Sequence, residues 1–258
     1  MNEYILLTGA SSGIGEALVY AYDKAGAKLI LSSRNRDELY RVKSNCKSPV
    51  NIHVLPLDLE NTAALPDKAE EAIRIYGHVD ILINSGGISQ RSLALETTLQ
   101  TEQRLMNVNF WGTVALSKAV LPNMIAKGAG KIVCISSLVG KFGTRFRSSY
   151  SASKHALHGY FDSLRSEVYD KNINITLVCP GFIKTNVSIN ALTGDGNPQG
   201  TMDSAQDNGM PAGECARLII DAIKKNKEEA EDPKAHPWNL CPIGQHWVRT
   251  HPLHVTPS

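Results

Sequence analysis

Short apolar runs alternate along this chain with longer stretches of helical periodicity. The apolar runs predict β-strands at Tyr4–Thr8, Lys28–Ser33, Ile52–Leu57, Val79–Asn84, Lys131–Ser136 and Asn174–Cys179. Several of them are apolar at successive positions, which is typical of parallel strands that are covered on both faces. The helical periods predict helices at 13–25, 35–45, 62–76, 97–126, 150–171 and 211–226. This alternation predicts a single α/β domain on a doubly wound parallel sheet of Rossmann type.

Two segments depart from the alternation. Residues 186–210 are rich in Gly, Asn, Asp and Ser and predict a long loop with at most a short helix. A loop of this length in a compact domain is commonly functional, so we expect it to border the substrate. Residues 230–258 contain five prolines, four histidines and two tryptophans without periodicity. We therefore expect an oxidoreductase domain over 1–229, an irregular tail over 230–258, and a sheet that lacks a regular seventh strand.

Composition narrows the class of protein. Hydrophobic residues make up 42% and charged residues 20% of the 258 residues, with a net charge of +2. These values are typical of a globular protein with a full core and give no reason to expect a nucleic-acid partner. No apolar run approaches the roughly 18 residues of a membrane span, and the first strand begins too early to leave room for a signal peptide. We expect a cytoplasmic protein.

The five cysteines are scattered and form no Cys-x-x-Cys pair, which favours a reducing compartment. In the tail, Cys241 with His246, His251 and His254 resembles part of a zinc site, but a second spaced pair is missing. We expect no bound metal.

The turn after the first strand carries glycines at positions 9, 13 and 15. Glycines permit a tight turn and a close approach of the backbone to a pyrophosphate, and the next helix presents free N–H groups to it. Ser11 and Ser12 could donate hydroxyl hydrogens or cap the helix. The predicted phosphate-binding residues are Gly9, Ser11, Ser12, Gly13, Ile14 and Gly15. An ordinary strand–helix turn is the alternative.

The ends of the next strands predict the rest of a dinucleotide site. In sites that select NAD, an acidic residue after the second strand binds the ribose 2′-hydroxyl, but this chain has none there. Arg34 stands there instead, and its guanidinium suits the 2′-phosphate of NADP. This favours NADP(H) over NAD(H). Asp58 and Leu59 could meet the adenine, although Asp58 could equally cap the next helix. Asn84 and Gly86 could lie against a flat ring, although a plain turn would also use such residues.

Tyr150 and Lys154 stand four residues apart, on one face of a predicted helix. A free tyrosine has a pKa of about 10, and a neighbouring ammonium group would lower it toward neutrality. Tyr150 could then exchange a proton with the oxygen of a substrate carbonyl group. Ser137 closes the fifth strand, where its hydroxyl could hydrogen-bond the same carbonyl oxygen. Asn109 could hold a water that links Lys154 to solvent, or be a plain helix-surface residue. The chain has no Gly-x-Ser-x-Gly elbow, so a hydrolase is disfavoured.

Together these motifs resemble the single-domain branch of the short-chain dehydrogenase/reductase superfamily, over residues 4 to about 229. The resemblance implies that Tyr150 is the acid/base, that Lys154 also binds the nicotinamide ribose, and that Asn109 completes a proton relay. It implies that Asn84 and Gly86 line the part of the site that holds the adenosine. Because Arg34 stands after the second strand, it also implies NADP(H) as the cofactor. The nicotinamide amide would meet the residues after the motif formed by Pro180 and Gly181, namely Ile183 and Thr185.

The segments 146–156 and 180–186 look closer still to the dehydrogenase/reductase family member 7 group, especially its B form, which is associated with lipid-type ketones. The resulting prediction is an NADP(H)-dependent oxidoreductase that interconverts a ketone or aldehyde and an alcohol by hydride transfer, on a small lipid- or steroid-like substrate. The alternative is a nucleotide-binding protein of the same fold with little turnover, because its C-terminus differs from that of relatives. The resemblance also implies a homodimer or homotetramer.

Overall fold

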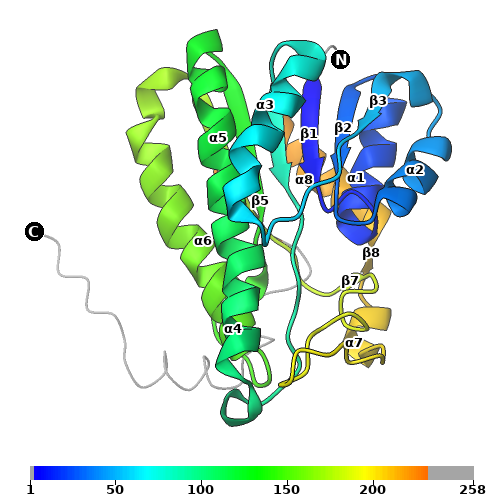
Figure 1. Cartoon of the computed structure of the whole chain (residues 1–258), viewed down its shortest axis with the longest axis vertical. Coiled ribbons are helices and arrows are strands. Elements are labelled where there is room, and N and C mark those ends of the chain that lie inside the picture. The colour runs from blue at the N-terminus through cyan, green and yellow to red at the C-terminus, as the bar shows by residue number, and fades with distance from the viewer. Residues whose placement is uncertain (1–2, 232–258) are drawn as a thin grey trace, which may run out of the picture.

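The predicted parallel sheet forms the centre of the structure, a computed structural model that describes residues 3–231 (Figure 1). Its seven strands run in the order β3-β2-β1-β4-β5-β6-β9, and all neighbouring pairs are parallel. The strands are β1 Tyr4–Thr8, β2 Lys28–Ser32, β3 Ile52–Val54, β4 Ile81–Asn84, β5 Gly130–Ile135, β6 Ile173–Cys179 and β9 Glu229–Glu231. The helices are α1 Gly13–Lys24, α2 Arg36–Ser44, α3 Leu65–Tyr76, α4 Leu99–Met106, α5 Gly112–Lys127, α6 Ser148–Glu167, α7 Ser204–Asp207 and α8 Ala212–Lys224. The doubly wound α/β fold is confirmed.

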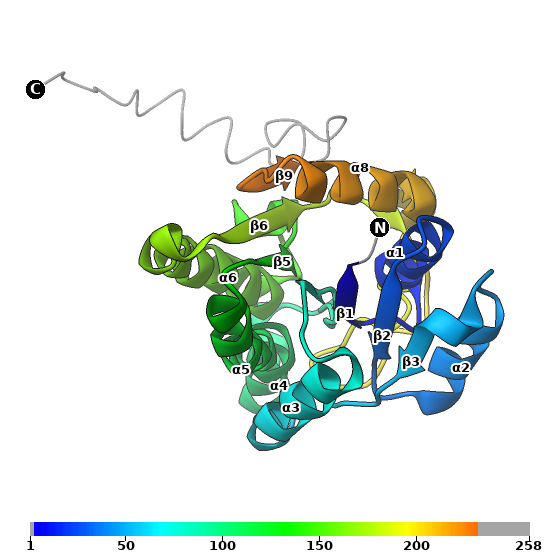
Figure 2. The ribbon, with the colours of Figure 1, turned by 90° about the horizontal axis from the view of Figure 1, so that it is seen from above.

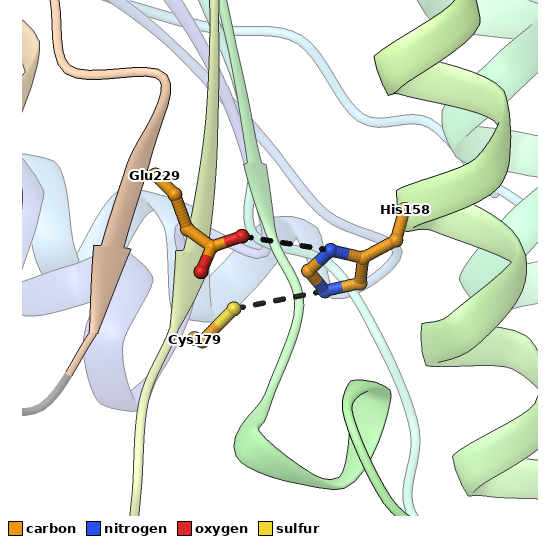
Figure 3. Close-up of side chains that lie close together, drawn as sticks. All are labelled: His158, Cys179 and Glu229. Carbon is orange, nitrogen blue, oxygen red and sulfur yellow. Dashed lines mark hydrogen bonds and ion pairs between the residues drawn. The ribbon is translucent and has the colours of Figure 1, made fainter. Parts of the chain in front are cut away.

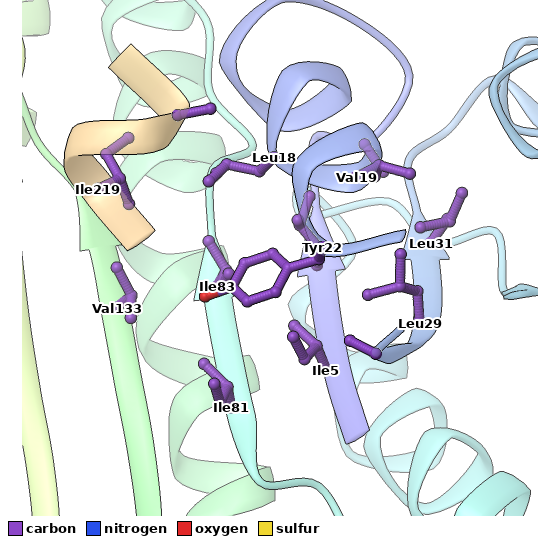
Figure 4. Close-up of a cluster of buried hydrophobic side chains, with 14 of the residues drawn as sticks. Ile5, Leu18, Val19, Tyr22, Leu29, Leu31, Ile81, Ile83, Val133 and Ile219 are labelled. Carbon is purple, nitrogen blue, oxygen red and sulfur yellow. The ribbon is translucent and has the colours of Figure 1, made fainter. Parts of the chain in front are cut away.

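Helices cover both faces of the sheet, as Figure 2 shows from above. On one face α1, α2 and α8 bury a cluster in which Tyr22 and Ile219 meet strand residues such as Ile83 (Figure 4). On the other face α3, α5 and α6 bury a second cluster around Phe161 and Met124. Since every central strand is apolar on both sides, both clusters exclude water from the sheet, which explains the successive apolar positions.

The helix predicted over 97–126 is interrupted. A π-helical turn over Asn107–Trp111 separates α4 from α5. A π turn contains one more residue than an α turn and is frequent at functional sites. It includes Asn109, whose side chain is buried. Periodicity alone did not reveal this insertion, because the flanking helices continue in nearly the same direction (Figure 1).

The expectation that the sheet lacks a seventh strand is wrong. β9 pairs in parallel with β6, placing Glu229 beside Leu177 and Glu231 beside Cys179. Two further hydrogen bonds secure the approach to β9: Leu177 N donates to Glu228 O (2.9 Å), and Thr176 Oγ1 donates to Lys227 O (2.7 Å). Strand pairing uses backbone groups, so charged side chains are tolerated at an edge. The predicted boundary at 229/230 thus falls inside a strand, and the rest of the predicted tail, 232–258, lies outside the described residues.

The predicted loop 186–210 contains the short helix α7 and is anchored at its base. There, β7 (Ile183–Lys184) pairs with β8 (Met210–Pro211). Within the described part of the chain, no helix is both long and apolar enough to cross a membrane.

Phe161 provides a test of the second core cluster. Its side chain is fully buried, so Phe161→Ala should lower the free energy of unfolding by about 3–5 kcal/mol, through lost burial and an unfilled cavity. The control is Tyr169→Ala, since that side chain is 87% exposed. Urea denaturation checks both variants, and a loss below about 1 kcal/mol for Phe161→Ala would contradict the packing described here.

Candidate active site

A cavity of about 1030 Å³ opens at the carboxyl ends of the strands. This is where parallel α/β sheets bind their ligands. All predicted site residues line the cavity except Asn84 and Asn109. The structure therefore gathers residues from seven separate segments, between positions 9 and 185, around one space.

The glycine-rich turn forms one wall of the cavity and packs so closely against the turn after β4 that no side chain fits between them. Gly9 has φ +68°, and a Cβ there would lie 2.7 Å from the backbone nitrogen of Gly86. A Cβ at Gly15 would collide with the carbonyl oxygen of Gly9. The Thr8 hydroxyl oxygen accepts hydrogen bonds from Ser85 N (3.2 Å) and Gly86 N (3.1 Å). These contacts leave bare backbone facing the cavity at the N-terminus of α1, which fits a pyrophosphate.

The predicted capping role of Ser12 is wrong, because its side chain makes no capping hydrogen bond although it occupies the N-cap of α1. The turn is held instead by Arg41 of α2, which sequence reasoning missed. Its guanidinium donates to Glu16 Oε1 (2.7 Å), Glu16 Oε2 (3.0 Å) and Ser11 O (3.1 Å). This bidentate pair ties the phosphate-facing turn to α2.

The residues predicted for the adenosine side differ in what they do. Arg34 is exposed at the rim of the cavity, where its guanidinium is free to meet a phosphate. Asp58 also lines the cavity, and its Oδ1 accepts from Glu60 N (3.0 Å) in a local turn. It does not cap the next helical segment, Thr62–Ala64, whose N-cap is Asn61. Asn84 points away from the cavity: its Nδ2 donates to Ser117 Oγ of α5 (3.0 Å), and the side chain is buried beneath the strand end.

Asn109 lies behind the cavity wall. Its Oδ1 accepts from Ile88 N (2.8 Å), and its Nδ2 donates to Ile88 O (2.9 Å) and to Ser153 Oγ (3.1 Å). A Cβ at Gly87 would lie 3.1 Å from Asn109 Oδ1 and 3.6 Å from Lys154 Nζ. Asn109 therefore holds the segment after β4 close to Lys154.

Tyr150, Lys154 and Ser137 meet at the wall of the cavity. Lys154 Nζ lies 5.7 Å from the centroid of the Tyr150 ring and donates to Ile135 O (2.8 Å). Ser137 ends the segment after β5, and its Oγ accepts from Val139 N (3.3 Å). The three side chains come from α6 and from the segment after β5, and all three line the cavity.

Burial dominates the electrostatics of this group. Burial raises the pKa of Tyr150, and this rise is opposed by a hydrogen bond with Ser137 and by the positive charges of Arg147 and Arg91. The predicted partner Lys154 is not among these groups. Burial also lowers the pKa of Lys154 to about 8. Enclosure by the cavity walls thus disfavours the charged form of both residues.

Arg91 and Arg147 line the cavity and were missed by sequence reasoning. Arg91 Nε donates to Asp203 Oδ2 (2.7 Å), and Arg147 Nη2 lies 3.6 Å from the same oxygen. Two guanidinium groups share one carboxylate, so positive charge is in excess beside Tyr150. The available signal was Arg147 itself, which stands three residues before Tyr150 and is the N-cap residue of α6.

Known proteins have sequences similar to this one. A sequence profile of the family described as short chain dehydrogenase matches residues 3–195. An Anopheles gambiae protein named Dehydrogenase/reductase SDR family protein 7-like is 44% identical over 263 residues, covering 100% of this chain and 80% of that protein. The Mus musculus Dehydrogenase/reductase SDR family member 7B is 40% identical over 234 residues, covering 88% of this chain and 72% of that protein.

Solved structures share the fold. A Burkholderia phymatum short chain dehydrogenase/reductase in complex with NAD has a TM-score of 0.83 at 22% identity, covering 96% of this chain and 94% of that one. An alcohol dehydrogenase from Thermococcus sibiricus complexed with 5-hydroxy-NADP has a TM-score of 0.76 at 21% identity, covering 90% and 95%. With a matching family profile, relatives of at least 40% identity and this cavity, the chain belongs to the short-chain dehydrogenase/reductase family.

Proposed function

We propose that the protein is an NADP(H)-dependent oxidoreductase that interconverts a ketone or aldehyde and an alcohol. The family supports an oxidoreductase. The observation that carries the finer proposal is the meeting of Ser137, Tyr150 and Lys154 in a cavity that the glycine-rich turn also lines. A purified protein that oxidises NADPH in the presence of a ketone panel would support the proposal over the idle nucleotide-binding alternative.

The residues of the cavity fit a dinucleotide. Bare backbone at Gly9 and Gly15 accommodates a pyrophosphate, and Arg34 at the rim suits a 2′-phosphate. Ile183 and Thr185 line the same cavity as Tyr150. A bound nicotinamide would supply or accept the hydride. Solved structures of the same fold are named as complexes with NAD and with 5-hydroxy-NADP, so the choice of NADP(H) here rests on Arg34 and on the missing carboxylate.

The chain's own residues handle the proton. Tyr150 lines the cavity and its hydroxyl is hydrogen-bonded to Ser137, so both hydroxyl groups can hydrogen-bond the oxygen of one substrate carbonyl. We assign the acid/base role to Tyr150 and the orientation of the carbonyl to Ser137. Excess positive charge from Arg91 and Arg147 favours the phenolate that forms when Tyr150 gives up its proton. Asn109 contributes by holding the Ile88 backbone.

The oligomeric state, the cellular location and the substrate class are further expectations from the sequence. A homodimer or homotetramer, a cytoplasmic location and a lipid- or steroid-like substrate stay predictions. The relatives named as family members 7 and 7B motivate the substrate prediction only by similarity.

Removing the phenol oxygen tests the acid/base role. Tyr150→Phe keeps the ring but loses the transferable proton, so turnover should fall by at least about 100-fold, while NADPH binding should be preserved. Steady-state rates and fluorescence titration measure the two effects. The control is Tyr169→Phe at an exposed position. Turnover within about threefold of the unmodified protein would place the proton donor elsewhere.

Cofactor preference is tested at Arg34. A charge-assisted contact to the 2′-phosphate is worth about 1.5–3 kcal/mol, so Arg34→Ala should weaken NADPH binding by about ten- to a hundredfold and leave NADH binding nearly unchanged. Arg36→Ala is the matched control, because Arg36 stacks on Tyr40 (5.5 Å) and does not line the cavity. Equal dissociation constants for NADPH and NADH in the unmodified protein would overturn the NADP(H) assignment.

Burial of Lys154 predicts a pH dependence of stability. Burial lowers the pKa of Lys154 from 10.5 to about 8, so between these pH values this residue binds more protons in the unfolded chain, and the contribution of Lys154 to stability rises with pH. In the cofactor-free protein this rise should be on the order of 3 kcal/mol and should be absent in Lys154→Met. Urea denaturation across this range compares the two. Lys131→Met is the control, since Lys131 donates to Ile223 O (3.0 Å) from a less buried position. Parallel pH profiles for Lys154→Met and the unmodified protein would contradict the prediction.

A further inference from the structure

Three potential metal ligands from separate elements converge behind the cavity wall (Figure 3). They are His158 of α6, Cys179 at the end of β6 and Glu229 of β9, and one donor atom from each lies within 4.8 Å of the others. Cys179 is fully buried, and the His158 side chain is 11% exposed. The proposed reaction uses none of the three.

The distance between the thiol and the imidazole suits a small tetrahedral ion. Cys179 Sγ lies 3.6 Å from His158 Nε2. With Zn–S near 2.3 Å and Zn–N near 2.0–2.1 Å, two ligands of one tetrahedral zinc ion lie about 3.6 Å apart. Thiolate, imidazole and carboxylate together favour zinc over magnesium or calcium, which prefer oxygen ligands.

The third ligand has to rearrange, because Glu229 lies beside His158 Nδ1 whereas Cys179 lies beside Nε2, and one ion binds only one of the two ring nitrogens. Glu229 Oε2 lies 3.9 Å from His158 Nδ1 and is paired with Lys141 Nζ. Both side chains are about one-third exposed, at 35% and 33%, so the carboxylate can turn toward the thiol while the ammonium group moves into water. Gly140 allows a backbone turn to cover the site, since a Cβ there would lie 3.1 Å from His158 Nε2.

We propose that His158, Cys179 and Glu229 bind one zinc ion, with water as the fourth ligand. The ion would fasten the three-residue edge strand β9 to β6 and α6 and would take no part in hydride transfer. The proposal is independent of the proposed function. It also departs from the sequence-based expectation of no metal, because His158 and Cys179 are 21 residues apart and only folding brings Glu229 to them.

Cobalt provides the test, because Co²⁺ replaces zinc in such sites and gives a thiolate charge-transfer absorption. The full chain is stripped with chelator and titrated with Co²⁺, and then Zn²⁺ is added in competition. One equivalent of cobalt should bind with the thiolate band, zinc should displace it, and zinc should raise the melting temperature. Absence of the band, or a band without displacement by zinc, would overturn the proposal.

Variants locate the ligands. Cys179→Ser should abolish the thiolate band, while Cys46→Ser, at a buried cysteine near the opposite sheet edge, and Cys241→Ser should retain it. Loss of the band in Cys241→Ser with retention in Cys179→Ser would overturn the proposal in favour of the tail.

Glu229→Gln covers the case in which Cys179→Ser fails to fold, because Glu229 is on the sheet edge; it should weaken zinc binding at least about tenfold. Lys141→Met removes the competing ammonium group and should tighten zinc binding, whereas a purely structural ion pair would leave zinc affinity unchanged. Unchanged affinity in both variants would overturn the proposal. NADPH titration of each variant reports separately on the cofactor cavity.

Discussion

The site depends on one close approach, between the turn after β1 and the turn after β4. Thr8 accepts hydrogen bonds from Ser85 and Gly86, and no side chain fits at Gly9 between the two turns. β1 and β4 are neighbours in the sheet where the strand order reverses, the point at which doubly wound sheets open a crevice. This backbone contact forms one wall of the cavity.

Helix α6 carries the proposed acid/base residues beside these turns, since a Cβ at Gly87 would lie 3.6 Å from Lys154 Nζ. Tyr150, Lys154 and His158 follow one another at four-residue spacing and therefore share a face. The first two border the cavity, and the third lies deeper, beside Ser136, whose Oγ is 3.1 Å from His158 Nε2. One helix face thus links the proposed reaction to the proposed zinc ligands and to the edge strand, although the two sites use different residues.

Electrostatic balance at the reacting end comes from residues distant in the sequence. Burial disfavours the charged forms of Tyr150 and Lys154. Arg91, Arg147 and Asp203 come from three segments. Two positive charges face one negative charge, and the remaining positive potential opposes the rise in the pKa of Tyr150. Asp203 belongs to the loop 186–210, so the position of that loop is coupled to the charge beside the phenol.

The sequence by itself determined six strands of the sheet, the glycine turn and the helix that bears Tyr150, because local periodicity and turn chemistry act over a few residues. It did not determine the π turn at Asn109 or the pairing of β9, whose Glu-rich segment lacks strand propensity and pairs through its backbone. Only the tertiary structure decided that Asn84 points away from the cavity and that His158, Cys179 and Glu229 meet. Such contacts depend on chain packing between distant segments, which no local pattern encodes.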